Sequence, residues 1–308
     1  MYSILYIIYF SIKRHQKRLF QKNKKPSIIY DRIIGNIEAY YNLFWKNKKE
    51  SHPSNKEGIN TKHRDKKIIA SLTSFPKRIN TVWLTIETLL NQTMKPDSII
   101  LWLAKEQFDG IDSLPENLKR LQSRGLTIRF CDDLRSHKKY YYAMSENPDD
   151  IVILFDDDMF YPRDTIKKLY DLHRKFPDDI CSINTQVMSG GFESMPSTWR
   201  NPFINEKINS SDKVQVFTGS GSLFPPGVLD KEVFNKSAIM KLCPYADDLW
   251  LTFMAYQKNT RISSVNKWRS FPVTIYSTGE SSLWYINSQQ GKNDEQWNNL
   301  LNHYSNVL

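Results

Sequence analysis

The chain has 308 residues, of which 40% are hydrophobic and 13% aromatic. This composition is sufficient for a packed core and excludes a wholly disordered chain. The net charge of +10 is uneven, because residues 1–67 hold 16 of the 43 basic residues and only 5 of the 33 acidic ones. A nucleic-acid enzyme usually carries its positive charge on the folded domain, so we do not expect nucleic acid as a partner.

The first 25 residues join an apolar run to a basic one. About ten mostly apolar residues come first, too few for a spanning helix, which needs about 20. Seven lysines and arginines follow, whereas a signal peptide carries its positive charge before the apolar run. This order predicts a peripheral contact with an anionic membrane surface. An ordinary first helix with a solvated basic face is the alternative.

The next segments predict a leader followed by one domain. Residues 26–47 have apolar side chains at helical spacing, and residues 47–67 are polar, charged and typical of a linker. We therefore expect a basic, partly helical leader with its linker at residues 1–65, and a single domain at residues 66–308.

From residue 67 the pattern alternates between short apolar runs and amphipathic stretches. The runs predict strands and the stretches predict helices, which together favour an α/β domain with a mostly parallel sheet. Gly125 is expected to end the second helix and Asp164 to cap the fourth. The expected strands are residues 67–75, 98–104, 126–131 and 150–155; the helices are 78–92, 114–124, 137–147 and 164–176.

After residue 180 the pattern loosens into segments rich in Gly, Ser, Pro and aromatic residues, which predict loops. Helices are expected again at residues 246–259 and 293–304, and short strands at 262–266 and 271–277. Three cysteines lie far apart without metal-ligand spacing, which predicts buried, reduced thiols in a reducing, cytoplasmic compartment.

Three adjacent aspartates, Asp156, Asp157 and Asp158, follow the fourth expected strand. Ligands of parallel α/β sheets bind beyond the carboxyl ends of the strands, so this triad is expected in the binding crevice. If the strand continued, Asp156 and Asp158 would share one face. Carboxylate oxygens suit Mn²⁺ or Mg²⁺, which would relieve their repulsion. A solvated acidic turn or a helix-capping cluster is the alternative.

Five segments in order resemble a family-2-like nucleotide-sugar glycosyltransferase with the GT-A fold, of the bacterial surface-polysaccharide type. They are residues 68–79, 132–144, 152–162, 219–229 and 246–251, within a stretch of about residues 68–298. The resemblance implies a GT-A-like, mostly parallel sheet flanked by helices, a nucleoside-diphosphate sugar as donor, and Mn²⁺ or Mg²⁺ as cofactor. It places the cation on Asp156 and Asp158.

The resemblance also implies a donor site around the acidic triad. An arginine suits phosphate recognition, although Arg78 also fits an ordinary surface position at a helix start. Lys139 is the alternative to Lys138, and both also fit a partly exposed amphipathic helix. The residues expected at the donor are Thr73, Ser74, Pro76, Arg78, Lys138, Asp156 and Asp157, the last without a separate role.

The acceptor side follows from the "ADDLWL" segment and the Gly-Ser loop. In inverting members of the family the second acid is the general base, which corresponds to Asp248, with Asp247 as its neighbour. Such chemistry needs a carboxylate, because the attacking sugar hydroxyl must lose its proton. Retention stays open, and an acidic helix start, a plain turn and a buried core Trp are the structural alternatives. The expected substrate-binding residues are Gly219, Ser220, Gly221 and Trp250, with Trp199 and Trp284 as further stacking candidates.

The expected function is therefore metal-dependent, inverting transfer of a sugar to a saccharide or lipid-linked saccharide hydroxyl. The family analogy favours capsule or lipopolysaccharide synthesis at the inner face of the membrane. A haloacid-dehalogenase-like phosphatase is one alternative, but it carries its acids on the first strand and expects Thr or Val where Phe160 stands. A non-catalytic glycan- or membrane-binding module is the other.

Overall fold

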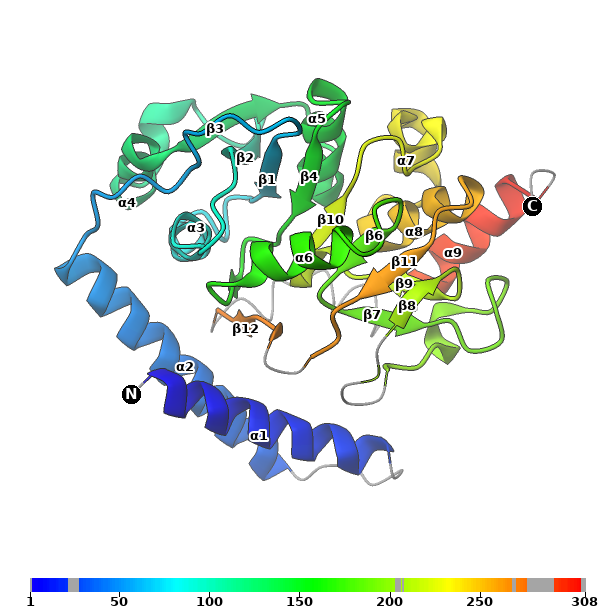
Figure 1. Ribbon diagram of the computed structural model, residues 1–308, viewed down its shortest axis with the longest axis horizontal. Helices are drawn as coiled ribbons and strands as arrows, with labels where there is room; N and C mark the ends of the chain where they lie inside the picture. The colour runs from blue at the N-terminus through cyan, green and yellow to red at the C-terminus, as the bar shows by residue number, and fades with distance from the viewer. Residues whose placement is uncertain are drawn as a thin grey trace.

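The computed structural model describes residues 2–21, 28–202, 206, 208–267, 270–275 and 291–305. An α/β domain is preceded by a hairpin of two long helices, which lies along one side of it near strand β12, Val273–Thr274 (Figure 1). None of the helices in these residues is both long enough and apolar enough to cross a membrane.

An eight-stranded sheet in the order β3-β2-β1-β4-β10-β6-β11-β8 forms the centre of the domain. All of its strands except β10 and β8 run in the same direction, so the predicted mostly parallel α/β sheet is confirmed. The strands are β1 Ile68–Thr73, β2 Ser98–Ala104, β3 Leu126–Cys131, β4 Ile151–Leu154, β6 Ile180–Ser182, β8 Ile208–Ser211, β10 Ser222–Phe224 and β11 Ile262–Ser264.

The first half of the domain follows the sequence pattern closely. Helices α3 Val82–Leu90, α4 Glu116–Lys119, α5 Lys138–Glu146 and α6 Thr165–His173 lie at the expected places. Gly125 has a φ of 108° and ends the 3₁₀ helix η2 Arg120–Arg124, which continues α4. Asp164 does precede α6, but its side chain makes no capping hydrogen bond and instead pairs with Lys168.

The second half contains more sheet than the sequence pattern predicts. Strand β10 lies between β4 and β6, within a segment that we expected to be loop. Strands β7 Thr185–Val187 and β9 Val214–Val216 form a separate pair, and β5 Met159–Phe160 pairs with β12 Val273–Thr274. Strands of two or three residues have no readable periodicity, and their neighbours in the sheet stabilise them.

The remaining helices complete the domain. Helices α8 Asp247–Gln257 and α9 Lys292–His303 confirm the two helices predicted at residues 246–259 and 293–304, whereas α7 Lys236–Leu242 was not predicted. Short 3₁₀ segments are η1 Ile111–Ser113, η3 Arg135–His137, η4 Pro196–Thr198, η5 Thr218–Ser220 and η6 Lys231–Phe234. Residues 276 and 277 of the last expected strand lie outside the described residues.

Two hydrophobic cores lie on the two faces of the sheet. Alternate residues of β1 enter different cores, because successive side chains of a strand point to opposite faces. Ile69 packs with α5, α8 and α9, whereas Ile68 and Ala70 pack with α3, α6 and the hairpin. The three cysteines, as predicted, are free and buried, and burial raises the pKa of each thiol.

The N-terminal hairpin consists of α1 Tyr2–Gln21 and α2 Ile28–Ser51. Helix α2 extends into the segment that we expected to be linker from residue 47. Its Tyr41 and Trp45 rings lie 5.3 and 6.1 Å from the ring of Phe160, measured between centroids. The hairpin is therefore packed on the strand that directly follows the acidic triad.

A buried ionic cluster also joins the hairpin to the domain. The two Glu87 oxygens on α3 accept hydrogen bonds from Lys49 Nζ and Arg124 Nη1, each at 2.7 Å. All three residues are buried, and Glu87 is only 2% exposed. One carboxylate thus compensates two cations that have little access to water.

We expect Glu87→Ala to lower the free energy of unfolding by about 3–5 kcal/mol, because it leaves two buried cations without their carboxylate. Urea denaturation measures the change. Glu116→Ala is the matched control, since Glu116 is 84% exposed and pairs with Lys119 on the surface; it should have little effect. Equal losses in the two variants would contradict the assignment.

Candidate active site

The acidic triad follows β4 at the edge of the sheet where ligands of α/β folds bind. The strand ends at Leu154, and Asp157 and Asp158 already lie in a turn. The expectation that Asp156 and Asp158 share a strand face is therefore wrong. Instead, Asp157 and Asp158 both pair with Arg78, whereas Asp156 pairs with Lys139.

Asp157, for which the sequence offered no separate role, anchors the loop. Its carboxylate accepts hydrogen bonds from Ser74 Oγ at 2.5 Å and Arg78 Nη1 at 2.7 Å, and its carbonyl accepts one from Thr85 Oγ1. Burial raises the pKa of Asp157, and the charge of Arg78 opposes this rise. These bonds join the loop after β1 to the triad, so both loops are held in one arrangement.

Lys139 connects the triad to the second acidic pair. Its ammonium lies 2.6 Å from Asp156 Oδ1 and 2.9 Å from Asp247 Oδ2, and the residue is 3% exposed. Burial alone would lower the pKa of Lys139, but the charges of Asp156, Asp247 and Asp248 outweigh it and raise the pKa. Lys139 therefore remains charged between the acidic triad and the acidic pair at the start of α8.

Of the two neighbouring lysines, we expected Lys138 rather than Lys139 at the donor site. Lys138 pairs with Asp133 at 2.5 Å, so it is Lys139 that contacts the triad. One feature of the sequence applies to both lysines. A lysine in the first turn of a helix is repelled by the positive end of the helix dipole. Two of them at the start of α5 therefore require nearby carboxylates.

Asp247 and Asp248 begin α8, and their surroundings separate their pKa values. Burial would raise the pKa of Asp247, but Lys139 outweighs it and lowers this pKa to about 2. Burial and the charge of Asp247 raise the pKa of Asp248 to about 7. Asp248 Oδ1 accepts hydrogen bonds from Thr218 N at 2.9 Å and Thr218 Oγ1 at 2.5 Å. One acid of the pair is thus ionised, and the other can exchange a proton near neutral pH.

The Gly-Ser loop lies directly against the triad. A Cβ atom on Gly219 would overlap Asp156 Oδ2, so a larger residue at this position would displace this carboxylate. Tyr161 joins the two loops, because its hydroxyl accepts from Asp156 N and donates to the Gly219 carbonyl. Gly221 has a φ of 100°, which favours glycine there as well.

The other expected site residues lie at different depths. Thr73 donates to the Trp102 carbonyl, Pro76 is exposed, and Ser220 is half-buried near the triad's loop. The structure corrects the expectation for Trp250, which is fully buried and donates its Nε1 proton to the Val233 carbonyl. A ring enclosed on all sides offers no face to a sugar. Trp199 is likewise a core residue, and Trp284 lies outside the described residues.

The donor set of the triad fits a hard divalent cation. Asp156 and Asp158 supply only carboxylate oxygens, and the Asp156 side chain is 37% exposed. Within the described part of the chain no group of three or more His, Cys, Asp or Glu forms a metal cage. Two carboxylates completed by water and a diphosphate are a usual arrangement for Mg²⁺.

Comparison with known families identifies the chain. The model of Glycosyl transferase family 2 matches residues 74–232, just over half of the 308 residues. The chain belongs to this family. The resemblance of its motifs predicted this family, and the matched range contains the triad, Lys139 and the Gly-Ser loop.

Solved structures show more distant likeness. Residues 1–349 of TarS from S. aureus are 13% identical and align over 78% of this chain and 72% of that chain, with a TM-score of 0.45. A mannosyltransferase from Pyrobaculum calidifontis, in complex with GDP-Man and Mn²⁺, is 13% identical over 58% of this chain, with a TM-score of 0.31. The match spans 46% of that mannosyltransferase chain. No curated protein matches the chain.

We expect Gly219→Ala to lower glycosyl transfer about tenfold or more, because the added methyl group displaces the Asp156 carboxylate. Release of nucleoside diphosphate from a panel of sugar donors measures the loss. Gly35→Ala in α2 is the control, since a Cβ there meets no atom within 4 Å. Wild-type activity in Gly219→Ala, with an unchanged melting temperature, would contradict this view of the loop.

Proposed function

We propose that the protein transfers a sugar, with inversion, from a nucleoside-diphosphate sugar to a saccharide hydroxyl, with Asp248 as the general base. The observation that carries this proposal is the divided acidic pair at the start of α8. Asp247 is held ionised by Lys139, whereas the pKa of Asp248 is about 7. A base is most effective when its pKa lies near the working pH.

The reaction follows from these positions. The acceptor hydroxyl transfers its proton to Asp248 while its oxygen bonds to the anomeric carbon, and the bond from that carbon to the diphosphate breaks. Hydrogen bonds from Thr218 fix the Asp248 carboxylate. Attack from the face opposite the leaving group inverts the anomeric configuration. The Lys139 ammonium lies 2.6 Å from an Asp156 oxygen and 2.9 Å from an Asp247 oxygen. These short distances support a donor and an acceptor that meet beside Lys139.

On the donor side, Asp156 and Asp158 would hold Mn²⁺ or Mg²⁺. When bound, the cation would supply positive charge to the departing diphosphate. Asp157 and Arg78 fix the loop that carries these carboxylates. We further propose that the loop after β1 and the α5 start face the nucleotide, and that the Gly-Ser loop faces the sugars. The residues involved are Thr73, Ser74, Pro76 and Lys139 on the first side, and Gly219, Ser220 and Gly221 on the second.

We also propose a leader at residues 1–65, a transferase domain at residues 66–308, and a role in surface polysaccharide synthesis. The acceptor would be a saccharide or lipid-linked saccharide, and residues 1–25 would contact the inner membrane face. The concentration of basic residues before residue 67 supports this location. Membership in the family argues against the phosphatase and the non-catalytic module.

We expect kcat to fall about tenfold per pH unit below pH 7, because Asp248 accepts a proton only when it is ionised and its pKa is about 7. Asp248→Asn should lose about 10²–10⁴-fold in kcat and no longer show this dependence. Asp171→Asn, which changes a surface ion pair on α6, is the matched control. Wild-type turnover in Asp248→Asn would remove Asp248 as the base, and a retained anomeric configuration by NMR would rule out inversion.

Chelation of divalent cations should abolish transfer, and added Mn²⁺ or Mg²⁺ should restore it. Asp158→Asn should raise the metal concentration for half-maximal activity by about tenfold or more, because it removes one of two proposed ligand carboxylates. Titration calorimetry with Mn²⁺ alone provides a second measurement. Full activity in chelator, together with unchanged Mn²⁺ binding by the variant, would contradict the metal assignment.

A further inference from the structure

Helix α2 has two apolar faces, and the domain uses only one of them. Its inner face, which includes Ile34, Tyr41 and Trp45, packs into the core of the domain. On the other side four large apolar side chains are exposed: Ile29 by 61%, Ile33 by 40%, Tyr40 by 50% and Leu43 by 59%. At 3.6 residues per turn these four positions fall within roughly 80° of one another, so they form one stripe.

We call the four side chains of this α2 stripe the outer face of the hairpin. Helix α1 has two further exposed apolar side chains, Ile7 and Ile8, each 43% exposed. Together the two helices carry six of the ten large hydrophobic side chains exposed in the described part of the chain. Single exposed apolar residues are ordinary, whereas a continuous group on one element marks a surface that another molecule covers.

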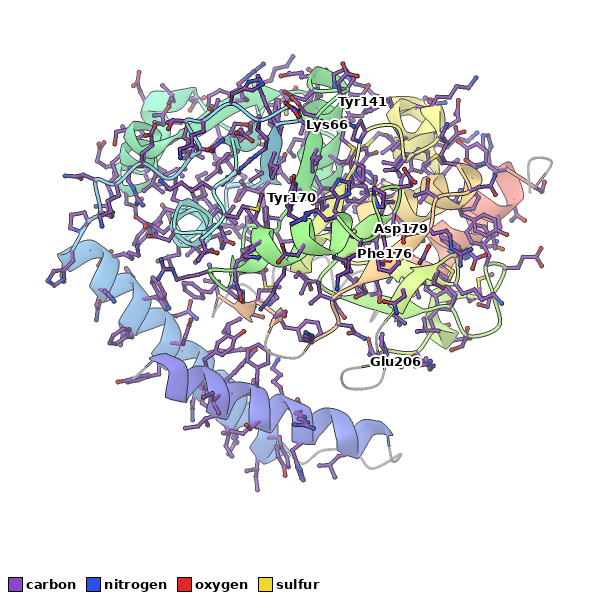
Figure 2. The ribbon with its side chains drawn as sticks, in the orientation of Figure 1. Lys66, Tyr141, Tyr170, Phe176, Asp179 and Glu206 are labelled. Carbon is purple, nitrogen blue, oxygen red and sulfur yellow. The ribbon has the colours of Figure 1, made fainter. Side chains whose placement is uncertain are left out.

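The packing of the hairpin fixes the direction of its outer face. Tyr41 and Trp45 hold α2 against Phe160, and Lys49 forms the buried ion pair with Glu87. Tyr6 of α1 donates a hydrogen bond to the Phe271 carbonyl at 3.1 Å. In Figure 2 other side chains of the hairpin extend on the side away from the domain. The inner contacts leave the outer face directed outward.

The positive charge of the hairpin favours an anionic lipid surface over a second copy of the hairpin as its partner. Residues 2–51 contain 11 basic and 3 acidic residues, and Arg32 and Lys46 are exposed on α2 near the apolar stripe. A second copy of this hairpin would bring two positive surfaces together, which is unfavourable. An anionic lipid surface fits both properties, because apolar side chains enter the acyl boundary while Lys and Arg contact headgroups.

We infer that the outer face of the hairpin docks on the surface of an anionic lipid bilayer, with α1 and α2 lying in the plane of the interface. The inference rests on the membrane location in the proposed function. It extends the contact beyond residues 1–25 to the stripe on α2. No helix needs to cross the bilayer for such binding.

The test is sedimentation of the full-length protein with vesicles of phosphatidylcholine alone or mixed with phosphatidylglycerol. We expect binding to the mixed vesicles only, weakening as salt rises. The triple variant Ile29→Asn, Ile33→Asn, Leu43→Asn should reduce partitioning about tenfold or more. The control variant Ile111→Asn, Met240→Asn changes apolar side chains of 37% and 38% exposure outside the hairpin, and should bind as wild type does.

Each alternative outcome overturns the inference. Equal partitioning of the triple variant and wild type would show that the α2 stripe is not the docking surface. A concentration-dependent dimer in light scattering that the triple variant loses, with no vesicle binding by wild type, would assign the stripe to a second copy. Nucleoside diphosphate release in solution should be unchanged in the triple variant. Failure of lipid binding is thus distinguishable from failure of the proposed reaction.

Discussion

The site depends on one buried ammonium group placed between two carboxylates from different parts of the fold. Asp156 follows a strand in the middle of the sheet and Asp247 begins a helix 91 residues later, yet Lys139 contacts both. Without this charge the acids would repel one another in a poorly solvated space. With it, Asp247 stays ionised, and burial together with the charge of Asp247 raises the pKa of Asp248. The lysine therefore decides which acid of the pair can take a proton.

The same principle explains why three adjacent aspartates are tolerated after a buried strand. Each has its own surroundings: Asp156 faces Lys139 and the Gly-Ser loop, whereas Asp157 and Asp158 share Arg78. The chain leaves its strand before the triad, so the carboxylates do not need to alternate across a sheet. Arg78 and Lys139, which come from separate elements, compensate these carboxylates. The acidic run therefore connects parts of the fold as well as forming a candidate ligand site.

The predicted and observed elements differ where local sequence signals do not determine the structure. Apolar runs predicted β1, β2 and β4, because four to six buried residues in a row leave few other conformations. Strand β3 was predicted as well, although only its two end residues are buried. Strand β10, with three residues beside glycine and proline, had no such signal and depends on β4 and β6. The choice between Lys138 and Lys139 was equally hidden, because one residue along a helix turns the side chain by about 100°. Trp250 was expected to stack on a sugar, and only the structure shows that its ring is fully buried.

The hairpin and the site are connected through the backbone that separates them. Trp45 packs on Phe160, two residues after Asp158, and Phe160 pairs with Val273 in the small β5–β12 ladder. Ile275, two residues after Val273, donates its backbone N–H to the Asp158 carbonyl at 2.7 Å. A force that reorients α2 must therefore act on the turn that carries the triad. The leader is better described as one support of the site than as a separate attachment, because its inner face packs on the strand that directly follows the acidic triad.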